Sequence, residues 1–383
     1  MDCSGSKQKF RGMAYNARLA FIDLAEDPGP SLSTPADLYN ELFAVLYDQG
    51  AKISSHSWGS SSAIYSTAAM AADAFMHDFE DALILFAAGN QGEDGPSTIL
   101  SPGMSKNILS VGASLNDHRA FGEAPSRYNK NNLAAFSSRG PTIGDRLKPE
   151  VCAPGMYIDS AYAEDGAEPV CSRDLMSGTS MATPVTAGNA ALAREYFVAG
   201  YHPTGERNPA DGFTPSGALL KAVLVHSTRR LKKRLVGNSA VNIPYPGNEQ
   251  GFGRIVLGDV LPTPKYNYFT LIVKGDVAAN DHELTANGQE HHISVQTTSN
   301  SKYQRPLVAT LVWIDHPSGT GVLVNNLDLF ITDTDTATVY RPLWTTTMDN
   351  KDDKNPVEKA SHAVCTSVSC PVLNLPSPLP SRW

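Results

Sequence analysis

Residues 173–188 read RDLMSGTSMATPVTAG, and they place a serine where a helix is expected to begin. Gly178 and Thr179 form a tight turn before Ser180, and an alanine-rich run follows to about residue 197. A serine at a helix entrance suits two roles, because its side chain can cap the first turn and its hydroxyl can act as a nucleophile. The second role requires a base and a group that stabilises an oxyanion.

The segments on either side of this serine alternate between strand and helix patterns. A helix is expected to begin at Thr34 and Pro35 and to end near Gly50. Two further helices are expected at about residues 68–79 and 216–227. Strands connected by helices over short loops predict an α/β fold with a parallel sheet flanked by helices. The apolar runs expected to be buried strands are residues 17–24 (ARLAFIDL), 52–58 (KISSHSW), 82–88 (ALILFAA) and 107–113 (NILSVGA).

The composition excludes several classes of function. The 383 residues carry a formal net charge of −8, and the basic run at residues 229–234 is interpreted as a solvated helix end, so no nucleic-acid binding is expected. No apolar stretch approaches the roughly 20 residues of a membrane span, and residues 1–12 lack a signal-peptide core. The oligomeric state is left open.

The chain changes character after Pro262. Strands without helices are expected at residues 269–273, 292–295, 307–313 and 326–331. They predict a small antiparallel β-sandwich over residues 263–360. Residues 361–383 are rich in proline and serine, and we expect this tail to be disordered or foreign to the domain.

The five cysteines match no zinc-binding spacing. Cys152 and Cys171 could form a disulfide in an oxidising compartment, and two separate thiols fit the sequence equally well.

Asn90 is a candidate partner for Ser180. It follows the apolar run at residues 82–88 directly after Gly89. Ligand sites of open α/β sheets lie at the carboxyl ends of the strands, so Asn90 could donate to an oxyanion there. Considered alone, an asparagine after a glycine is better interpreted as a turn residue.

Two stretches together strongly resemble the subtilase family of subtilisin-like serine peptidases: residues 178–184 (GTSMATP) and 87–90 (AAGN). The resemblance extends over about residues 12–262 and implies a subtilisin-like domain in residues 1–262. Four further stretches resemble the family: residues 57–59 (SWG), 136–141 (FSSRGP), 148–155 (KPEVCAPG) and 251–255 (GFGRI).

The resemblance implies a serine endopeptidase that hydrolyses peptide bonds through an acyl-enzyme. It implies Ser180 as the nucleophile and Asn90 as the side-chain donor of the oxyanion hole. An extended protein or peptide substrate would lie between two pocket walls, which glycines would keep open to large side chains. One wall would be Ser57, Trp58 and Gly59, and the other Ala87, Ala88 and Gly89.

The family also uses an aspartate and a histidine that precede the serine, and no stretch of this chain resembles those motifs. We expect both to lie upstream of residue 1, so that the chain is N-terminally truncated, its sheet incomplete, and the chain alone inactive. His56 is expected to be a packed side chain that faces away from Ser57, and the resemblance places Asp23 downstream of the catalytic acid.

Two other functions fit the same residues. A pseudoprotease would bind peptides in the cleft without cleaving them, and upstream aspartate and histidine motifs would exclude it. A serine hydrolase with a different base would need a histidine within hydrogen-bond reach of the Ser180 hydroxyl, and we predict none.

The region after Pro262 resembles the β-sandwich that follows the catalytic domain in certain alkaline, secreted subtilases, through residues 311–315 (LVWID) and 323–329 (LVNNLDL). That likeness implies an extracellular protein. Calcium is common in the family, so a structural calcium ion stays open, and no cofactor is required. The acidic residues 328–335 (DLFITDTD) lack the glycine of a calcium loop, and no metal ligands are assigned there.

Overall fold

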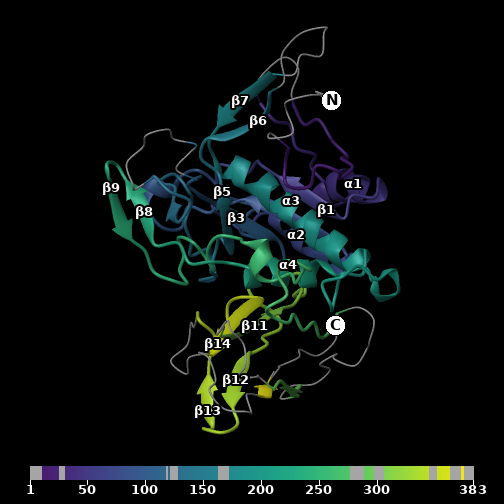
Figure 1. The fold of residues 1–383 in the computed structure, drawn as a ribbon. Helices are drawn as coiled ribbons and strands as arrows, with labels where there is room; N and C mark the ends of the chain where they lie inside the picture. The colour runs from purple at the N-terminus through teal and green to yellow at the C-terminus, as the bar shows by residue number, and fades with distance from the viewer. Residues whose placement is uncertain are drawn as a thin grey trace.

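The computed structural model describes residues 11–25, 31–117, 120, 128–162, 172–276, 289–296, 306–344 and 352–362, with the backbone of residues 372–374. An α/β unit occupies the upper part of Figure 1, and small antiparallel sheets lie beneath it. The parallel sheet with helices and the antiparallel C-terminal sheets predicted from the sequence are both confirmed.

The α/β unit is built on a seven-stranded mixed sheet in the order β1-β2-β3-β4-β8-β9, with β5 also paired to β3. The pairs β1/β2, β2/β3 and β3/β5 are parallel. Every residue of β2 and β3 is buried, which explains their unbroken apolar runs. The strands are β1 (Ile53–His56), β2 (Leu83–Ala87), β3 (Leu109–Ser114), β4 (Asn132–Leu133), β5 (Val151–Pro154), β8 (Lys233–Val236) and β9 (Ser239–Asn242).

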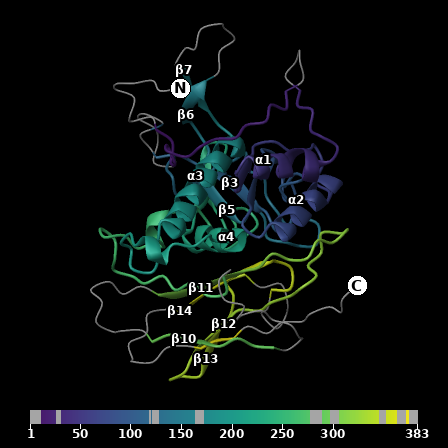
Figure 2. The same ribbon diagram turned by 90° about the vertical axis from the view of Figure 1, so that its right-hand side faces the viewer.

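Three helices pack on this sheet: α2 (Thr67–Asp78), α3 (Thr179–Val198) and α4 (Gly217–His226). Ser66 and Ser216 cap the N-termini of α2 and α4, each accepting a backbone N–H three residues later. Figure 2 shows α3 running past β3 and β5, with α4 lying between it and the C-terminal sheets. A hairpin of β6 (Ile158–Tyr162) and β7 (Ser172–Met176) projects from the opposite end of the unit (Figure 1).

The helix expected between Thr34 and Gly50 is shorter than predicted. It begins at Leu38, continues as a π-helix over Tyr39–Phe43 and ends as α1 (Ala44–Asp48). The wider π turn rotates the residues that follow it. Val45, which follows this turn, is 43% exposed.

The prediction of a buried strand at residues 17–24 is wrong. The segment is extended but pairs with no strand among the described residues. Ile22 and Leu24 pack against the core, whereas Leu19 and Phe21 are 93% and 87% exposed. Residues 17–21 are all exposed, and burial alternates only from residue 21 to residue 24, so little of the segment is covered.

The C-terminal unit contains a four-stranded sheet, β10-β15-β12-β13, and a two-stranded sheet, β11-β14. The strand expected at residues 269–273 is absent. The strand expected at residues 326–331 starts only at Phe330, because the N–H of the preceding Leu329 donates to the Glu358 carboxylate at 2.5 Å. The strands are β10 (Ile293–Ser294), β11 (Leu307–Val312), β12 (Phe330–Asp333), β13 (Thr338–Tyr340), β14 (Val357–His362) and β15 (Val372–Asn374).

Strands β14 and β15 reach into residues 361–383, the segment expected to form the tail. β14 runs to His362, past the expected boundary at residue 360, and β15 pairs with β10 and β12. The pairing supplies backbone hydrogen bonds, which the composition of the tail does not reveal. Residues 363–371 and 375–383 lie outside the described residues.

Buried, paired charges join the two units. Lys106 Nζ lies 2.5 Å from Asp315 Oδ2, and neither side chain is exposed. Lys148 and Lys221 both contact Glu150 Oε1, at 2.5 and 3.0 Å. Removing one partner of such a pair would leave a buried charge uncompensated at a cost of about 3–5 kcal/mol.

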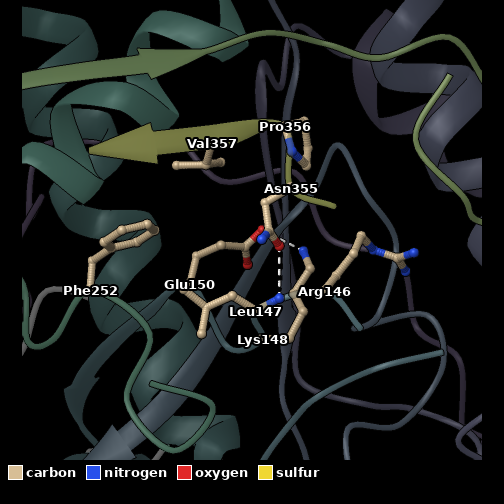
Figure 3. Close-up of a pocket in the computed structure, with 8 residues that line it drawn as sticks. All are labelled: Arg146, Leu147, Lys148, Glu150, Phe252, Asn355, Pro356 and Val357. Carbon is tan, nitrogen blue, oxygen red and sulfur yellow. Dashed lines mark hydrogen bonds and ion pairs between the residues drawn. The ribbon is translucent and has the colours of Figure 1, made fainter. Parts of the chain in front are cut away.

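Next to these charges the seam between the units forms a small pocket (Figure 3). The Leu147 N–H donates to Asn355 Oδ1 there at 2.7 Å, which ties the residues before β5 to those before β14. Glu150 directly precedes β5, so the pocket lies at the amino end of this strand. The lining residues are Arg146, Leu147, Lys148, Glu150, Phe252, Asn355, Pro356 and Val357.

A buried lysine of β14 caps the C-terminus of α4. Lys359 Nζ donates to the carbonyls of Val225 and His226 at 3.0 and 3.1 Å, and to Thr228 Oγ1 at 3.1 Å. A lysine at this helix end complements the helix dipole. Burial nevertheless lowers the pKa of Lys359 to about 8.

We predict that Lys359→Met flattens the dependence of stability on alkaline pH. The folded-state pKa of about 8 lies below the usual 10.5, so the unfolded chain binds more protons between pH 8 and 10.5. The free energy of unfolding must therefore rise as the pH is raised across this window. Urea unfolding at pH 8, 9 and 10 measures the slope of unfolding free energy against pH. Burial also lowers the pKa of Lys148, to about 7, so Lys148 contributes a part of this slope that the Lys359→Met variant keeps.

Lys265→Met is the matched control, because Lys265 is exposed. It should leave the slope unchanged. An equal slope in wild type and Lys359→Met would contradict the role given to Lys359.

Candidate active site

Ser180 is the second residue of α3, so its N–H is one of those that have no acceptor within the helix. The helix start is fixed to the end of β5, because the Gly178 N–H donates to the Gly155 carbonyl at 2.7 Å. A Cβ at Gly155 would lie 2.6 Å from the Gly178 oxygen and 2.8 Å from the Ala113 Cβ. Only glycine allows this close approach of β5 and the helix entrance.

Ser180 and Ser57 exchange hydrogen bonds. The Ser180 hydroxyl donates to the Ser57 carbonyl at 3.2 Å, and the Ser57 hydroxyl donates to the Ser180 carbonyl at 2.8 Å. The Ser180 carbonyl would ordinarily accept the N–H of residue 184, but Pro184 has none. The proline in the motif therefore leaves a carbonyl that the residue following β1 can bind.

Asn90 lies beside the helix entrance with its carboxamide held in one orientation. Its Oδ1 accepts the Thr179 N–H at 2.9 Å and the Thr179 hydroxyl at 3.0 Å. The Thr179 hydroxyl oxygen in turn accepts the Gly89 N–H at 3.2 Å. Because both contacts occupy Oδ1, Nδ2 stays available as a donor, and it lies against Gly178. Sequence reasoning did not assign this role to Thr179, although it stands within the motif.

The two segments expected to form the pocket walls follow neighbouring parallel strands, β1 and β2. Ser57, Trp58 and Gly59 follow β1, and Gly89 follows β2 with φ +111°, a conformation that favours glycine. The Ala88 side chain is fully buried and packs in a cluster with Ile99 and Met104. Ala87 is the last residue of β2 and is 8% exposed.

Leu100 lies between the two walls, and the sequence analysis missed it. A Cβ at Gly59 would lie 3.5 Å from the Leu100 Cβ, and one at Gly89 would lie 3.1 Å from the Leu100 Cγ. The Leu100 N–H also donates to the Ala88 carbonyl at 3.2 Å. In the sequence, Leu100 is a single leucine in a loop, and no periodic pattern distinguishes it from its neighbours.

His56 is a core side chain, as predicted. Its ring stacks on Phe86 with centroids 4.6 Å apart, and Phe43 and Trp58 meet it edge-on. Its Nε2 lies 2.6 Å from the Ser54 hydroxyl, and burial lowers the pKa of His56 to about 3. Among the described residues no histidine forms a hydrogen bond with Ser180.

The remaining residues considered from the sequence are Asp23, Cys152 and Cys171. Asp23 is exposed, and its carboxylate accepts the Ala25 N–H at 2.9 Å. Cys152 is a free, buried thiol whose pKa is raised by burial, and Cys171 lies outside the described residues.

Over the part of the chain that the structure describes, no three His, Cys, Asp or Glu side chains form a metal-binding group. In the same part, no helix combines the length and apolar character needed to cross a membrane.

We predict that His56→Asn weakens the loss of stability in acid. The folded-state pKa of about 3 lies below the usual 6.5, so the unfolded chain binds more protons between pH 6.5 and 3. The wild type must lose unfolding free energy as the pH falls through this window, and the variant should lose less. At pH 7 the variant should be about 1–3 kcal/mol less stable, because the ring contacts are gone. Urea unfolding at pH 7, 5.5 and 4.5 measures both effects.

His292→Asn is the matched control, because its side chain is 52% exposed. The expectation for His56 fails if the two variants show the same acid slope.

Comparison with known proteins identifies the family. The model of the Subtilase family matches residues 3–253. The chain is 30% identical to the serine protease/ABC transporter B family protein tagD of Dictyostelium discoideum, over 88% of this chain and 24% of that protein. It is 38% identical to the serine protease AprX of Bacillus subtilis (strain 168), over 29% of this chain and 25% of that protein.

Among solved structures, the prenylagaramide maturation protease PagA covers 62% of this chain and 70% of its own, at 20% identity and a TM-score of 0.41. The chain spans about a quarter of the length of the tagD protein. The family model covers well over half of the chain, and the chain therefore belongs to the Subtilase family.

Proposed function

We propose that this chain is the part of a serine endopeptidase that supplies the nucleophile, the oxyanion hole and the wall of the primary specificity pocket. Ser180 Oγ would attack the peptide carbonyl, and the negative charge on its oxygen would be held by Asn90 Nδ2 and the Ser180 N–H. The observation that carries the proposal is the Asn90 carboxamide, whose Oδ1 is bound by Thr179 so that a donor remains beside the helix that bears Ser180.

We further propose that the base and its orienting acid come from polypeptide that precedes these 383 residues. In the resting arrangement the Ser180 proton is donated to the Ser57 carbonyl, which is not a base of suitable strength. His56 is closed off by aromatic rings and stays neutral at physiological pH, so it does not replace the missing base. The supplied base would take the Ser180 proton and return it to the leaving amine.

The substrate would be an extended peptide whose side chain on the acyl side enters between the two walls. Leu100 would form the apolar floor, since it lies against both Gly59 and Gly89. The likeness of the C-terminal unit to sandwiches of secreted subtilases supports an extracellular location for the whole protein. The reaction as proposed requires no cofactor.

The first test is the reactivity of Ser180 towards a fluorophosphonate probe. The chain alone should label very slowly, because no base activates the hydroxyl. The natural upstream segment, expressed in frame or added, should accelerate labelling by several orders of magnitude and confer hydrolysis of a peptide substrate. Mass spectrometry of the labelled peptide identifies the modified residue.

Ser180→Ala must abolish labelling in both forms. In the complemented form, Asn90→Ala should lower kcat by about 10²–10³-fold, a range that belongs to subtilisin itself, for loss of an oxyanion donor. Rapid labelling by the chain alone would show that another base is present. A complemented form that binds peptides without cleaving them would support a pseudoprotease instead.

The second test concerns Leu100. In the complemented form, Leu100→Gly should shift kcat/KM towards substrates with larger side chains at the acyl position, by about 10-fold or more per added methylene pair. The measurement is a series of peptide substrates that differ only at that position. Ile99→Val is the control, because Ile99 packs in the cluster behind the wall. An unchanged preference for side-chain size would exclude Leu100 from the pocket.

A further inference from the structure

Two histidines from distant parts of the chain meet at the surface between the two units. His77 lies in the last turn of α2, and His316 lies in the loop after β11. Their ring centroids are 4.8 Å apart and the rings are inclined by 59°. The His77 side chain is 37% exposed and His316 is exposed, so solvent reaches both rings.

In both rings Nδ1 is the nitrogen that forms a hydrogen bond. His77 Nδ1 lies 3.1 Å from Asp78 Oδ1, and His316 Nδ1 lies 3.1 Å from the Pro317 carbonyl. A carboxylate and a carbonyl only accept hydrogen bonds, so Nδ1 carries the proton in each ring and Nε2 carries the lone pair. Tyr39 donates to the other oxygen of Asp78 at 2.8 Å, which fixes the carboxylate. Histidines that bind metals almost always donate their second nitrogen to such an acceptor.

The backbone beneath the two rings is held by a buried polar network. Asp73, one turn before His77 on α2, accepts the N–H groups of Lys106 and Asn107 at 3.0 and 2.7 Å. The Asn107 side chain accepts the Asp315 N–H and donates to the Asp315 carbonyl, each at 2.8 Å.

Lys106 Nζ completes this network by donating to the His316 carbonyl at 2.8 Å. Asp73, Lys106, Asn107 and Asp315 are all fully buried. The two histidines thus lie on segments that buried hydrogen bonds join, which is the support that a ligand site needs.

The geometry points to a binding site for a divalent transition-metal ion, ligated by Nε2 of His77 and Nε2 of His316 and completed by water. Imidazole ligands suit Zn²⁺, Cu²⁺ and Ni²⁺. No third His, Cys, Asp or Glu joins the pair in the described part of the chain, so the site is open and exchangeable. A bound ion would join α2 to the C-terminal unit at the surface, above the buried Lys106–Asp315 pair.

The test is thermal unfolding of the full 383-residue chain, stripped of metal with EDTA and titrated with Zn²⁺ at pH 7.5. The wild type should show a saturable rise in Tm of about 2–4 °C. His77→Gln, His316→Gln and the double variant should all lose the rise, since one imidazole alone binds weakly. His292→Gln, at an exposed histidine elsewhere, should keep it.

In EDTA the variants should unfold within about 1 °C of the wild type, because the replaced side chains are at the surface. A second measurement is independent of the variants: electron paramagnetic resonance of one equivalent of Cu²⁺ on the wild type should show hyperfine splitting from two imidazole nitrogens. No saturable rise, a rise that both single variants retain, or a Cu²⁺ spectrum without two nitrogens would overturn the site. None of these readouts depends on Ser180 or on peptide hydrolysis.

Discussion

The first turn of α3 is held by hydrogen bonds from residues that follow three parallel strands. Ser57 after β1, Asn90 after β2 and Gly155 after β5 each bond to the Gly178–Thr179–Ser180 backbone or its side chains. Parallel strands bring their carboxyl ends to one edge of a sheet, so the chain needs no long loops to collect these groups. The sheet therefore sets the positions of Ser180 and Asn90, the proposed nucleophile and oxyanion donor.

The opposite edge of the sheet serves a structural purpose. There the segment leading into β3 carries Lys106, which pairs with Asp315 of the C-terminal unit, and the segment leading into β5 carries the buried pair Lys148 and Glu150. Such charges are tolerated only with partners, and Asp315 of the second unit is one of them. The C-terminal unit consequently helps to shield the buried charges of the α/β unit from solvent.

The sequence predicted the elements whose period is strong and the residues within a specific motif. β1, β2, β3, α2 and α4 lie within about two residues of their expected positions, because apolar runs and helix caps are local signals. Thr179 and Leu100 could not be assigned, since their roles depend on partners that only folding brings near. Two apolar runs did not form the predicted strands: residues 269–273 form no strand, and residues 17–24 are only partly covered. An apolar run shows that a segment can be buried, but whether it is buried depends on the segments that pack against it.

The exchange of hydrogen bonds between Ser57 and Ser180 holds the hydroxyl of the proposed nucleophile against the residue that follows β1. The Ser180 hydroxyl has a single proton, which it donates to the Ser57 carbonyl, so transfer of this proton to a base would first require this hydrogen bond to break. A peptide that displaces Ser57 would loosen the same bond. Under the proposed function, binding of a peptide next to Ser57 would therefore be coupled to release of the Ser180 hydroxyl through the Ser57 carbonyl oxygen.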